Sequence, residues 1–427
     1  MSLARRQMSI VLCALALCAA GCRKRSPRAA SLRLDNGLRV ELLATSGGDK
    51  AGLALLFDVG ADHDPPGRSG MAHLIEHLFS TSGVAGKPAR TIDQLAAQYG
   101  HGFHASTGAD YTLYGLEVPA ARIMDEVEDV AARLSHLTPT ENDLARERKR
   151  LLSEIATTQE RDPLSVAMTR AAECVRATRG GGLRGGVAAE VEKMTLPEVE
   201  AFRRAYYGGA TARLIVVGPV DVEEATKRIK AAFAGVAAGT PPEARPPAAS
   251  RVTGTLVMGE APSAVAIAVP VPAPRDPDYA AFLALASRVT ASGNPARTWK
   301  ADFAPLARPD VLFVTSAIPA GQQGEAVAGR MRTDLNAIVT TPAAANEPDR
   351  VLAAFGRDLG MTPASEEACA ADPFATAFAV GRRAQLDIDG TALAHATRAV
   401  GPEQLAAAAK LFDGNHSAAV ITGARSP

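Results

Sequence analysis

Three side chains in one short apolar segment are of the types that bind metal ions. Residues 70–79 read GMAHLIEHLF, and the ionisable side chains in this segment are His73, Glu76 and His77. In a helix, the two histidines lie four residues apart on one face, with the glutamate beside them. Burying three such groups without partners is costly, whereas two imidazoles at this spacing can converge on one zinc ion. The alternative is a pair of hydrogen-bonded core histidines, but the HxxEH pattern favours a metal site.

A catalytic zinc ion usually has three protein ligands and one open position, so a third ligand must come from another segment. Residues 138–141 (TPTE) have the form of a capping box with proline at the first helical position, and they predict a helix that continues to about Glu160. Glu147 and Glu154 both fall on the apolar face of this helix. One can bind zinc while the other holds a ligand histidine in the correct tautomer, and the spacing alone does not assign the two roles. A salt bridge to a buried arginine is the alternative for either carboxylate.

Length and composition describe an ordinary globular protein of more than one domain. The chain has 427 residues, which is enough for two or three domains with their own cores. Lys plus Arg and Asp plus Glu both total 46, and aromatic residues make up 4%, so the sequence has neither the basic footprint nor the stacking residues of a nucleic-acid-binding protein. The glycine-rich residues 180–186 lack the Lys-Ser/Thr of a phosphate-binding loop. Cys174 and Cys369 are the cysteines outside the N-terminal segment, and the sequence does not show whether they pair.

Residues 1–22 have the pattern of an export signal. Arg5 and Arg6 precede an apolar run over residues 8–20, and small residues lead to Cys22. This segment resembles a bacterial lipoprotein signal peptide, in which cleavage before Cys22 is followed by lipidation of that cysteine; the alternative is an ordinary secretory signal. The apolar run is shorter than the ~20 residues of a membrane-spanning helix. We therefore expect an exported protein that is lipid-anchored to a bacterial membrane and faces the periplasm.

The body of the chain reads as two related halves. Residues 196–218 and 401–423 have equal lengths and share Pro, Glu and two Gly at matching places, and each predicts a helix, a glycine-bearing turn and a buried strand. A turn-rich segment, residues 239–250, reads as an interdomain linker. We therefore predict duplicated domains over residues 31–238, the catalytic domain, and residues 251–427, an inactive copy.

Strand patterns open both halves. Asp-Asn-Gly at residues 35–37 predicts a hairpin, and residues 51–59 and 263–271 read as equivalent buried strands. Long helical patterns follow in each half. The predicted fold class is α+β, with two duplicated α/β domains, each an antiparallel-rich sheet covered by helices.

Three segments of the first half resemble one family of enzymes. They are DVGADHDPPGRSGMAHLIEHLFSTSG from Asp58, HASTGADYTLYGLEVP from His104, and ERKRLLSEIATTQERDP from Glu147. The chain is similar in these segments to the pitrilysin/insulinase family of inverted-motif zinc peptidases, especially its half-length members related to mitochondrial processing peptidase. The resemblance covers most of the chain, strongly in the first half and weakly in the second.

This resemblance implies a site and a reaction. It implies one zinc ion per chain held by His73, His77 and Glu154, with Glu147 hydrogen-bonded behind a ligand histidine. It further implies a zinc endopeptidase acting on short or unfolded peptides, in which Glu76 takes a proton from a water acidified by the metal and returns it to the leaving amine. The strand that begins at His104 would pair with the extended substrate. The family usually has asparagine in place of His104. The hydrogen bond that this asparagine would make is therefore not carried over to this chain.

The second half lacks two features of the active family. The offset between the repeats carries His73, Glu76 and His77 onto Asp278, Ala281 and Phe282, and no HxxEH occurs after Ser80. The family also uses an Arg/Tyr pair from a non-catalytic half to stabilise the oxyanion. After the linker the chain has one tyrosine, Tyr279, and residues 296–318 contain Arg297 and Arg308 but no tyrosine. The resemblance therefore implies a heterodimer in which a second half-length subunit supplies the Arg/Tyr pair.

Two other functions compete with a peptidase. One is a zinc-binding, non-proteolytic scaffold or chaperone-like subunit, against which the intact Glu76 argues because zinc binding alone needs no general base. The other is the small metal lyase that acts on S-ribosylhomocysteine and also uses HxxEH. Its third ligand is a cysteine, and neither Cys174 nor a duplicated body of 427 residues suits it.

Overall fold

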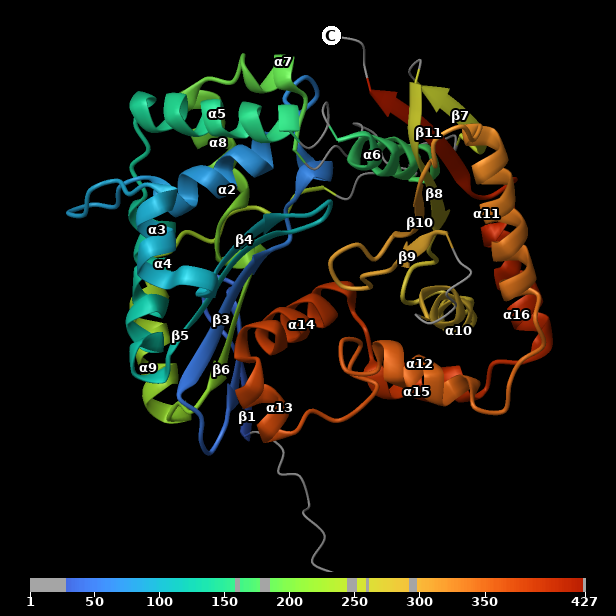
Figure 1. The fold of residues 1–427 in the computed structure, drawn as a ribbon. Coiled ribbons are helices and arrows are strands. Elements are labelled where there is room, and N and C mark those ends of the chain that lie inside the picture. Colours follow the sequence, from blue (N-terminus) through green and yellow to red (C-terminus); the bar gives the residue numbers. More distant parts are fainter. Residues whose placement is uncertain are drawn as a thin grey trace, which may run out of the picture.

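The computed structural model describes residues 28–157, 162–176, 185–243, 252–258, 261–291 and 298–424. It contains two mixed β-sheets, each accompanied by helices, which confirms the predicted fold class (Figure 1). The expected export signal with Cys22 and most of the expected linker, residues 244–250, lie outside the described residues.

The first sheet has six strands in the order β1-β2-β6-β3-β5-β4. All neighbours are antiparallel except β2 and β6, which are parallel. The predicted hairpin joins β1 to β2, and Gly37 in its turn has the positive φ of 91° that the Asp-Asn-Gly sequence favours. The strands are β1 (Arg28–Arg33), β2 (Arg39–Ala44), β3 (Lys50–Phe57), β4 (Phe103–Thr107), β5 (Thr112–Pro119) and β6 (Ala212–Gly218).

The second sheet repeats the arrangement of the first, except that β1 has no counterpart in it. Its order is β7-β11-β8-β10-β9, and β11 lies between a parallel β7 and an antiparallel β8, as β6 lies between β2 and β3. The two repeated sequences fold alike, one as α8 and β6 and the other as α16 and β11. The strands are β7 (Gly254–Met258), β8 (Ala261–Pro270), β9 (Lys300–Asp302), β10 (Val311–Ala317) and β11 (Ala418–Ala424).

Helices cover both faces of each sheet. The helices of the first half are α2 (Met71–Thr81), α3 (Ile92–Tyr99), α4 (Ile123–His136), α5 (Glu141–Ile155), α6 (Pro163–Val175), α7 (Ala188–Val191), α8 (Leu196–Tyr206) and α9 (Val222–Phe233). Those of the second half are α10 (Tyr279–Thr290), α11 (Gly324–Val339), α12 (Glu347–Phe355), α13 (Glu366–Ala371), α14 (Pro373–Leu386), α15 (Gly390–Arg398) and α16 (Pro402–Ala409). Within the described residues, no helix is long and apolar enough to cross a membrane.

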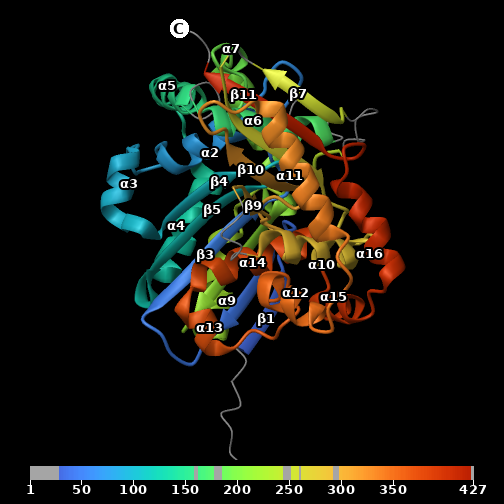
Figure 2. The same cartoon turned by 45° about the vertical axis from the view of Figure 1, so that its right-hand side comes forward.

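The halves exchange one helix each. α6 of the first half packs on β8 and β11 of the second sheet, and α14 of the second half packs on β3 and β6 of the first (Figures 1 and 2). Phe374 of α14 occupies a niche on the first sheet where Gly52 and Gly115 leave room, because a Cβ at either glycine would collide with α14. His104 stacks on the Phe374 ring with the centroids 3.8 Å apart. The exchange joins the two halves through apolar packing on both sheets.

The two cysteines do not pair. Cys174 lies in α6 against the second sheet and Cys369 lies in α13 against the first, and both are free thiols. The fold therefore does not depend on a disulfide between the halves.

Candidate metal centre

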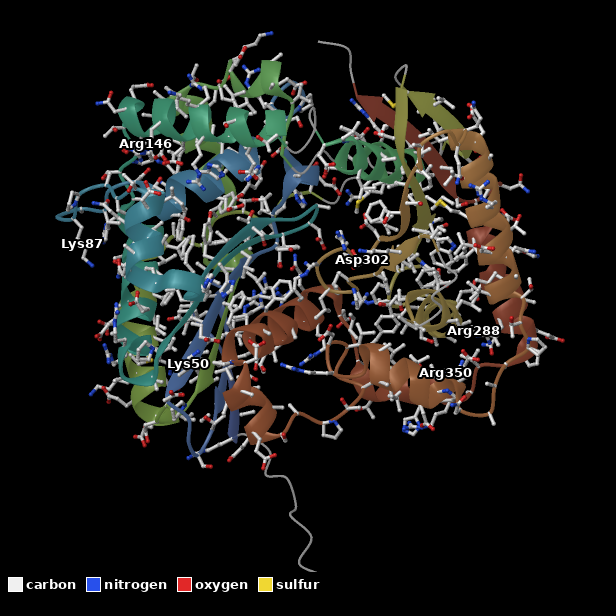
Figure 3. All side chains as sticks on the ribbon, in the orientation of Figure 1. Lys50, Lys87, Arg146, Arg288, Asp302 and Arg350 are labelled. Atoms are coloured by element: carbon white, nitrogen blue, oxygen red, sulfur yellow. The ribbon has the colours of Figure 1, made fainter. Side chains whose placement is uncertain are left out.

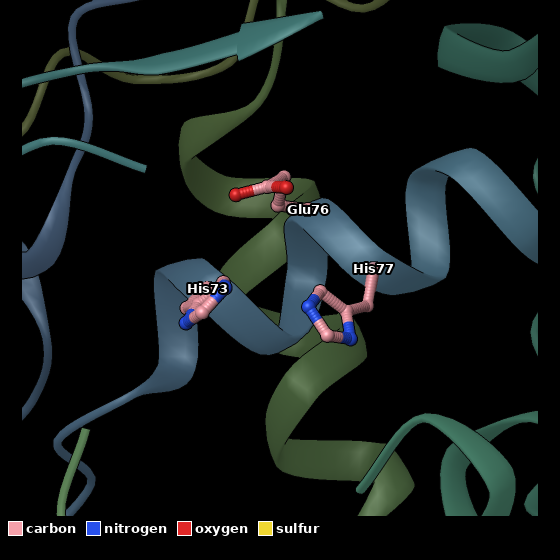
Figure 4. Close-up of side chains that lie close together, drawn as sticks. All are labelled: His73, Glu76 and His77. Atoms are coloured by element: carbon pink, nitrogen blue, oxygen red, sulfur yellow. The ribbon is translucent and has the colours of Figure 1, made fainter. Parts of the chain in front are cut away.

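The buried helix α2 carries His73, Glu76 and His77 (Figure 4). Its first turn is held by Asp64, whose carboxylate accepts hydrogen bonds from the backbone N–H groups of Gly70, at 2.7 Å, and Ala72, at 2.8 Å. These donors have no partner within the helix, and a carboxylate at a helix N-terminus also interacts favourably with the helix dipole. Asp64 therefore fixes where α2 begins and how the histidines are directed.

A close crossing of two backbone segments orients His73. Gly70 and Gly186 both have positive φ, and a Cβ on Gly186 would lie 2.6 Å from the Cα of Gly70. This approach brings the carbonyl oxygen of Gly185 to 3.4 Å from His73 Nδ1. Because a carbonyl only accepts, the contact favours a proton on Nδ1 and leaves Nε2 as the metal-binding nitrogen.

The Nε2 atoms of both histidines lie close to the carboxylate of Glu154. His73 Nε2 lies 3.6 Å from Glu154 Oε1, and His77 Nε2 lies 3.7 Å from Glu154 Oε2. Tetrahedral zinc with bonds of 2.0–2.2 Å places its ligand atoms about 3.4 Å apart. Two imidazoles and a carboxylate at these separations fit a zinc ion.

Glu76 belongs to the same cluster but makes a different contact. Ligand atoms of His73, Glu76 and His77 all lie within 4.8 Å of one another, so proximity alone would also allow Glu76 as a ligand. Its Oε2, however, accepts a hydrogen bond of 2.7 Å from the Thr107 hydroxyl on β4. This contact holds one oxygen of Glu76 against the edge strand, which suits a proton-transfer group better than a ligand.

Glu147 lies behind His77. Its Oε2 is 3.5 Å from His77 Nδ1, on the ring side opposite the one that approaches Glu154. Burial raises the pKa of Glu147, but the neighbouring side chains of His77, Arg146 and Thr81 and the charge of Arg150 outweigh it and lower the pKa to about 2. A carboxylate that remains ionised beside a histidine nitrogen holds the ring tautomer and raises the basicity of the other nitrogen.

The helix α5 differs in detail from the sequence prediction. Its N-cap is Thr140, which forms a reciprocal capping box with Asp143, so the start lies two residues later than the predicted box at 138–141. The α-helix runs to Ile155 and continues as a π-helical turn over residues 156–157, and the predicted end near Glu160 lies outside the described residues. The side chain of Glu154 is 44% exposed, so it is not part of the apolar face as expected. In the last turn of α5 it borders an open cavity instead.

The cluster lines a cavity of about 570 Å³ between the two halves. Residues 103 and 105–107 of β4 line it next to α2, whereas His104 points to the other face of the sheet, against Phe374. Arg150 of α5 and Gly185 also line it, and the opposite wall comes from α6, the residue after it and the second half, namely Ser165, Met168, Thr169, Ala172, Arg176, Arg308 and Phe313. This wall was not predictable from the sequence, because no local pattern shows that α6 crosses to the other half.

The helix α10 occupies the position of α2 in the second half, directly after β8. The offset between the repeats places the equivalents of the metal cluster on α10 or just before it. Its residues from Tyr279 to Val289 are buried and include no histidine or carboxylate. In the described ranges, α2 holds the one cluster of metal-ligating side chains. Tyr279 is buried in the core of the second half and does not line the cavity.

Two models of one protein family match consecutive parts of the chain. The model described as Insulinase (Peptidase family M16) matches residues 39–184, and the model described as Peptidase M16 inactive domain matches residues 193–295. The chain belongs to the insulinase family of peptidases. The first match contains α2 and Glu154, and the second ends after α10.

Individual members of the insulinase family are distant in sequence. Zinc protease PqqE of Helicobacter pylori is 25% identical over 211 residues, which is 48% of this chain and 47% of that protein. Mitochondrial-processing peptidase subunit beta of Dictyostelium discoideum is 23% identical over 214 residues, or 50% of this chain and 45% of that protein. The matched part thus spans about half the length of these relatives.

Solved structures share the fold over nearly the whole chain. A protease from Helicobacter pylori has a TM-score of 0.75 at 20% identity, covering 93% of this chain and 100% of that one. The periplasmic protease PqqL from Escherichia coli has a TM-score of 0.67 at 17% identity, covering 94% of this chain but 48% of that one. The second comparison shows that the two-sheet unit also occurs as half of a longer chain.

Proposed function

We propose that this protein is a zinc-dependent endopeptidase that hydrolyses short or unfolded peptides in the cavity between its halves. The observation that carries the proposal is the approach of His73 Nε2 and His77 Nε2 to the Glu154 carboxylate, with Glu76 beside them. The names of relatives as zinc proteases and the family membership support the same reaction.

The residues divide into those that hold zinc and those that act on the substrate. His73, His77 and Glu154 would hold one zinc ion, which when bound supplies a Lewis acid and lowers the pKa of a water to about 7. Glu76 would accept the proton of the attacking water and pass it to the leaving amine. The outer edge of β4 has no neighbour in the described sheet, so an extended peptide can add to it as a further strand.

The proposal includes a partner subunit. Among the cavity-lining residues that the structure describes, none is a tyrosine, and Tyr279 is buried elsewhere. One oxyanion donor is worth about 10²–10³ in rate. A second half-length subunit carrying an Arg/Tyr pair would complete the site. PqqL, in which a unit with the fold of this chain makes up 48% of a longer chain, supports this arrangement.

We place this peptidase outside the cytoplasm. The support is the sequence of residues 1–22, with two arginines, an apolar run and Cys22. Lipidation of Cys22 would anchor the protein to a bacterial membrane on its periplasmic side.

A quenched-fluorescence peptide library tests the proposal. The zinc-loaded protein should cleave the library slowly alone and at least about 100-fold faster with the partner subunit. A zinc-binding scaffold would cleave no peptide in either condition, although it would retain zinc. Full turnover by the isolated chain would refute the need for a partner while supporting the peptidase.

A further inference from the structure

The second half contributes a cation to the wall of the zinc cavity. Arg308 lies on the loop formed by residues 303–310, between β9 and β10, and lines the cavity together with His73, Glu76 and Glu154. Its guanidinium carbon lies 5.6 Å from the centre of the Phe313 ring, which also lines the cavity. A positive side chain and an aromatic ring from the second half therefore share the cavity with the catalytic groups of the first.

This loop is held at two points by other arginines. Arg382 of α14 donates from Nε to the carbonyl oxygen of Leu306 at 2.8 Å, and its other nitrogens pair with Asp110 in the turn between β4 and β5. Arg176, after α6, forms an ion pair with Asp310 at the end of the loop. The loop is thus fixed to the edge-strand hairpin on one side and to α6 on the other. A binding group on a loop held in this way loses little conformational freedom when a ligand binds.

The guanidinium of Arg308 has donors to spare. One terminal nitrogen pairs with Asp302, whose side chain is 59% exposed. Figure 3 places Asp302 on the side of the second half that faces the first. The buried Nε finds no hydrogen-bond partner among the described residues. A guanidinium carries five N–H donors in a fork that matches a carboxylate, and an ion pair with an exposed partner is weak.

We propose that Arg308 is a specificity-determining residue that binds a carboxylate of the peptide substrate. The carboxylate is either the C-terminal group or the side chain of an Asp or Glu near the scissile bond. Arg176 and Arg382 are positioning residues for the loop, and their own charges are balanced by Asp310 and Asp110. This inference rests on the proposed peptidase function, since it names the class of peptide that the same cavity selects.

The test measures binding without turnover. The zinc-loaded Glu76→Gln protein is titrated with four fluorescein-labelled hexapeptides of one sequence, with a C-terminal carboxylate or amide and with Glu or Gln at one inner position. We expect at least one carboxylate to tighten binding about tenfold over its uncharged twin, as a charge-assisted pair does. In the same background, Arg308→Gln should abolish this preference and change the affinity of the uncharged twin less than about twofold.

Two further variants sharpen the result. Asp302→Asn removes the competing carboxylate and should strengthen the preference, whereas Arg275→Gln, a surface arginine paired with Asp387, should leave it unchanged. The comparison of amides with acids identifies which carboxylate is bound. Equal binding of charged and uncharged peptides, or a preference that survives Arg308→Gln, would overturn this inference alone. Failure of all four peptides to bind would overturn the peptidase proposal as well.

Discussion

Glu147 and Glu154 lie on one helix but should differ in their effect on zinc affinity. Glu154→Gln removes the proposed carboxylate ligand, whose oxygens lie 3.6 Å from His73 Nε2 and 3.7 Å from His77 Nε2. Zinc binding by four ligands is worth roughly 10–16 kcal/mol, so one ligand accounts for about 2.5–4 kcal/mol, or a 100- to 1,000-fold loss of affinity. Glu147→Gln leaves an acceptor near His77 Nδ1 but removes its charge, and should cost about 10- to 100-fold.

The assay is zinc competition with a chelator of known affinity, with circular dichroism to verify folding. Because the pKa of Glu147 is lowered to about 2, this carboxylate is ionised between pH 6 and 8, and the effect of Glu147→Gln should be constant over that range. Glu141→Gln, at the exposed start of α5, is the matched control and should leave the affinity unchanged. A larger loss in Glu147→Gln than in Glu154→Gln would reverse the roles of the two carboxylates and refute this reasoning.

Three further changes test the surroundings of the site. Thr107→Val removes the hydrogen bond to Glu76 and should lower kcat about tenfold at unchanged zinc content; an unchanged kcat would show that this contact does not position Glu76. Phe374→Ala empties the niche between the halves and should lower the free energy of unfolding in urea by about 2 kcal/mol, since the ring is half-buried, whereas the exposed Val257→Ala should change it by less than about 0.5 kcal/mol. Cys22→Ala should turn a membrane-pelleting protein into one that stays in the supernatant, and a wild-type protein that is already in the supernatant would favour an ordinary secretory signal.

The site was predictable where its chemistry lies in short segments. His73, Glu76 and His77 occupy consecutive turns of one helix, so their spacing alone places their ligand atoms together. Assigning Glu154 as the metal ligand required the family resemblance, because Glu147 lies two turns earlier on the same helix and has the same side chain. The structure separates the two by exposure, since Glu147 is buried and Glu154 borders the cavity.

The arrangement of the halves was less predictable. The helices α6 and α14 have ordinary amphipathic sequences, and their local pattern does not say which sheet covers their apolar faces. Only in three dimensions does α6 reach the second sheet and bring Arg176 to the cavity. Arg308 was visible in the sequence, but its place beside the metal cluster depends on tertiary contacts of its loop with Arg382 and Arg176.

The most direct test of the account is one variant measured in two ways. Glu76→Gln should retain zinc at the wild-type level, because Glu76 is not among the proposed ligands, and should lose peptide hydrolysis by at least about 100-fold, because it carries the proton. Metal analysis and peptidase assays on the same preparation give both values. Loss of zinc together with activity would make Glu76 a ligand, and unchanged turnover at full zinc content would contradict the proposed mechanism.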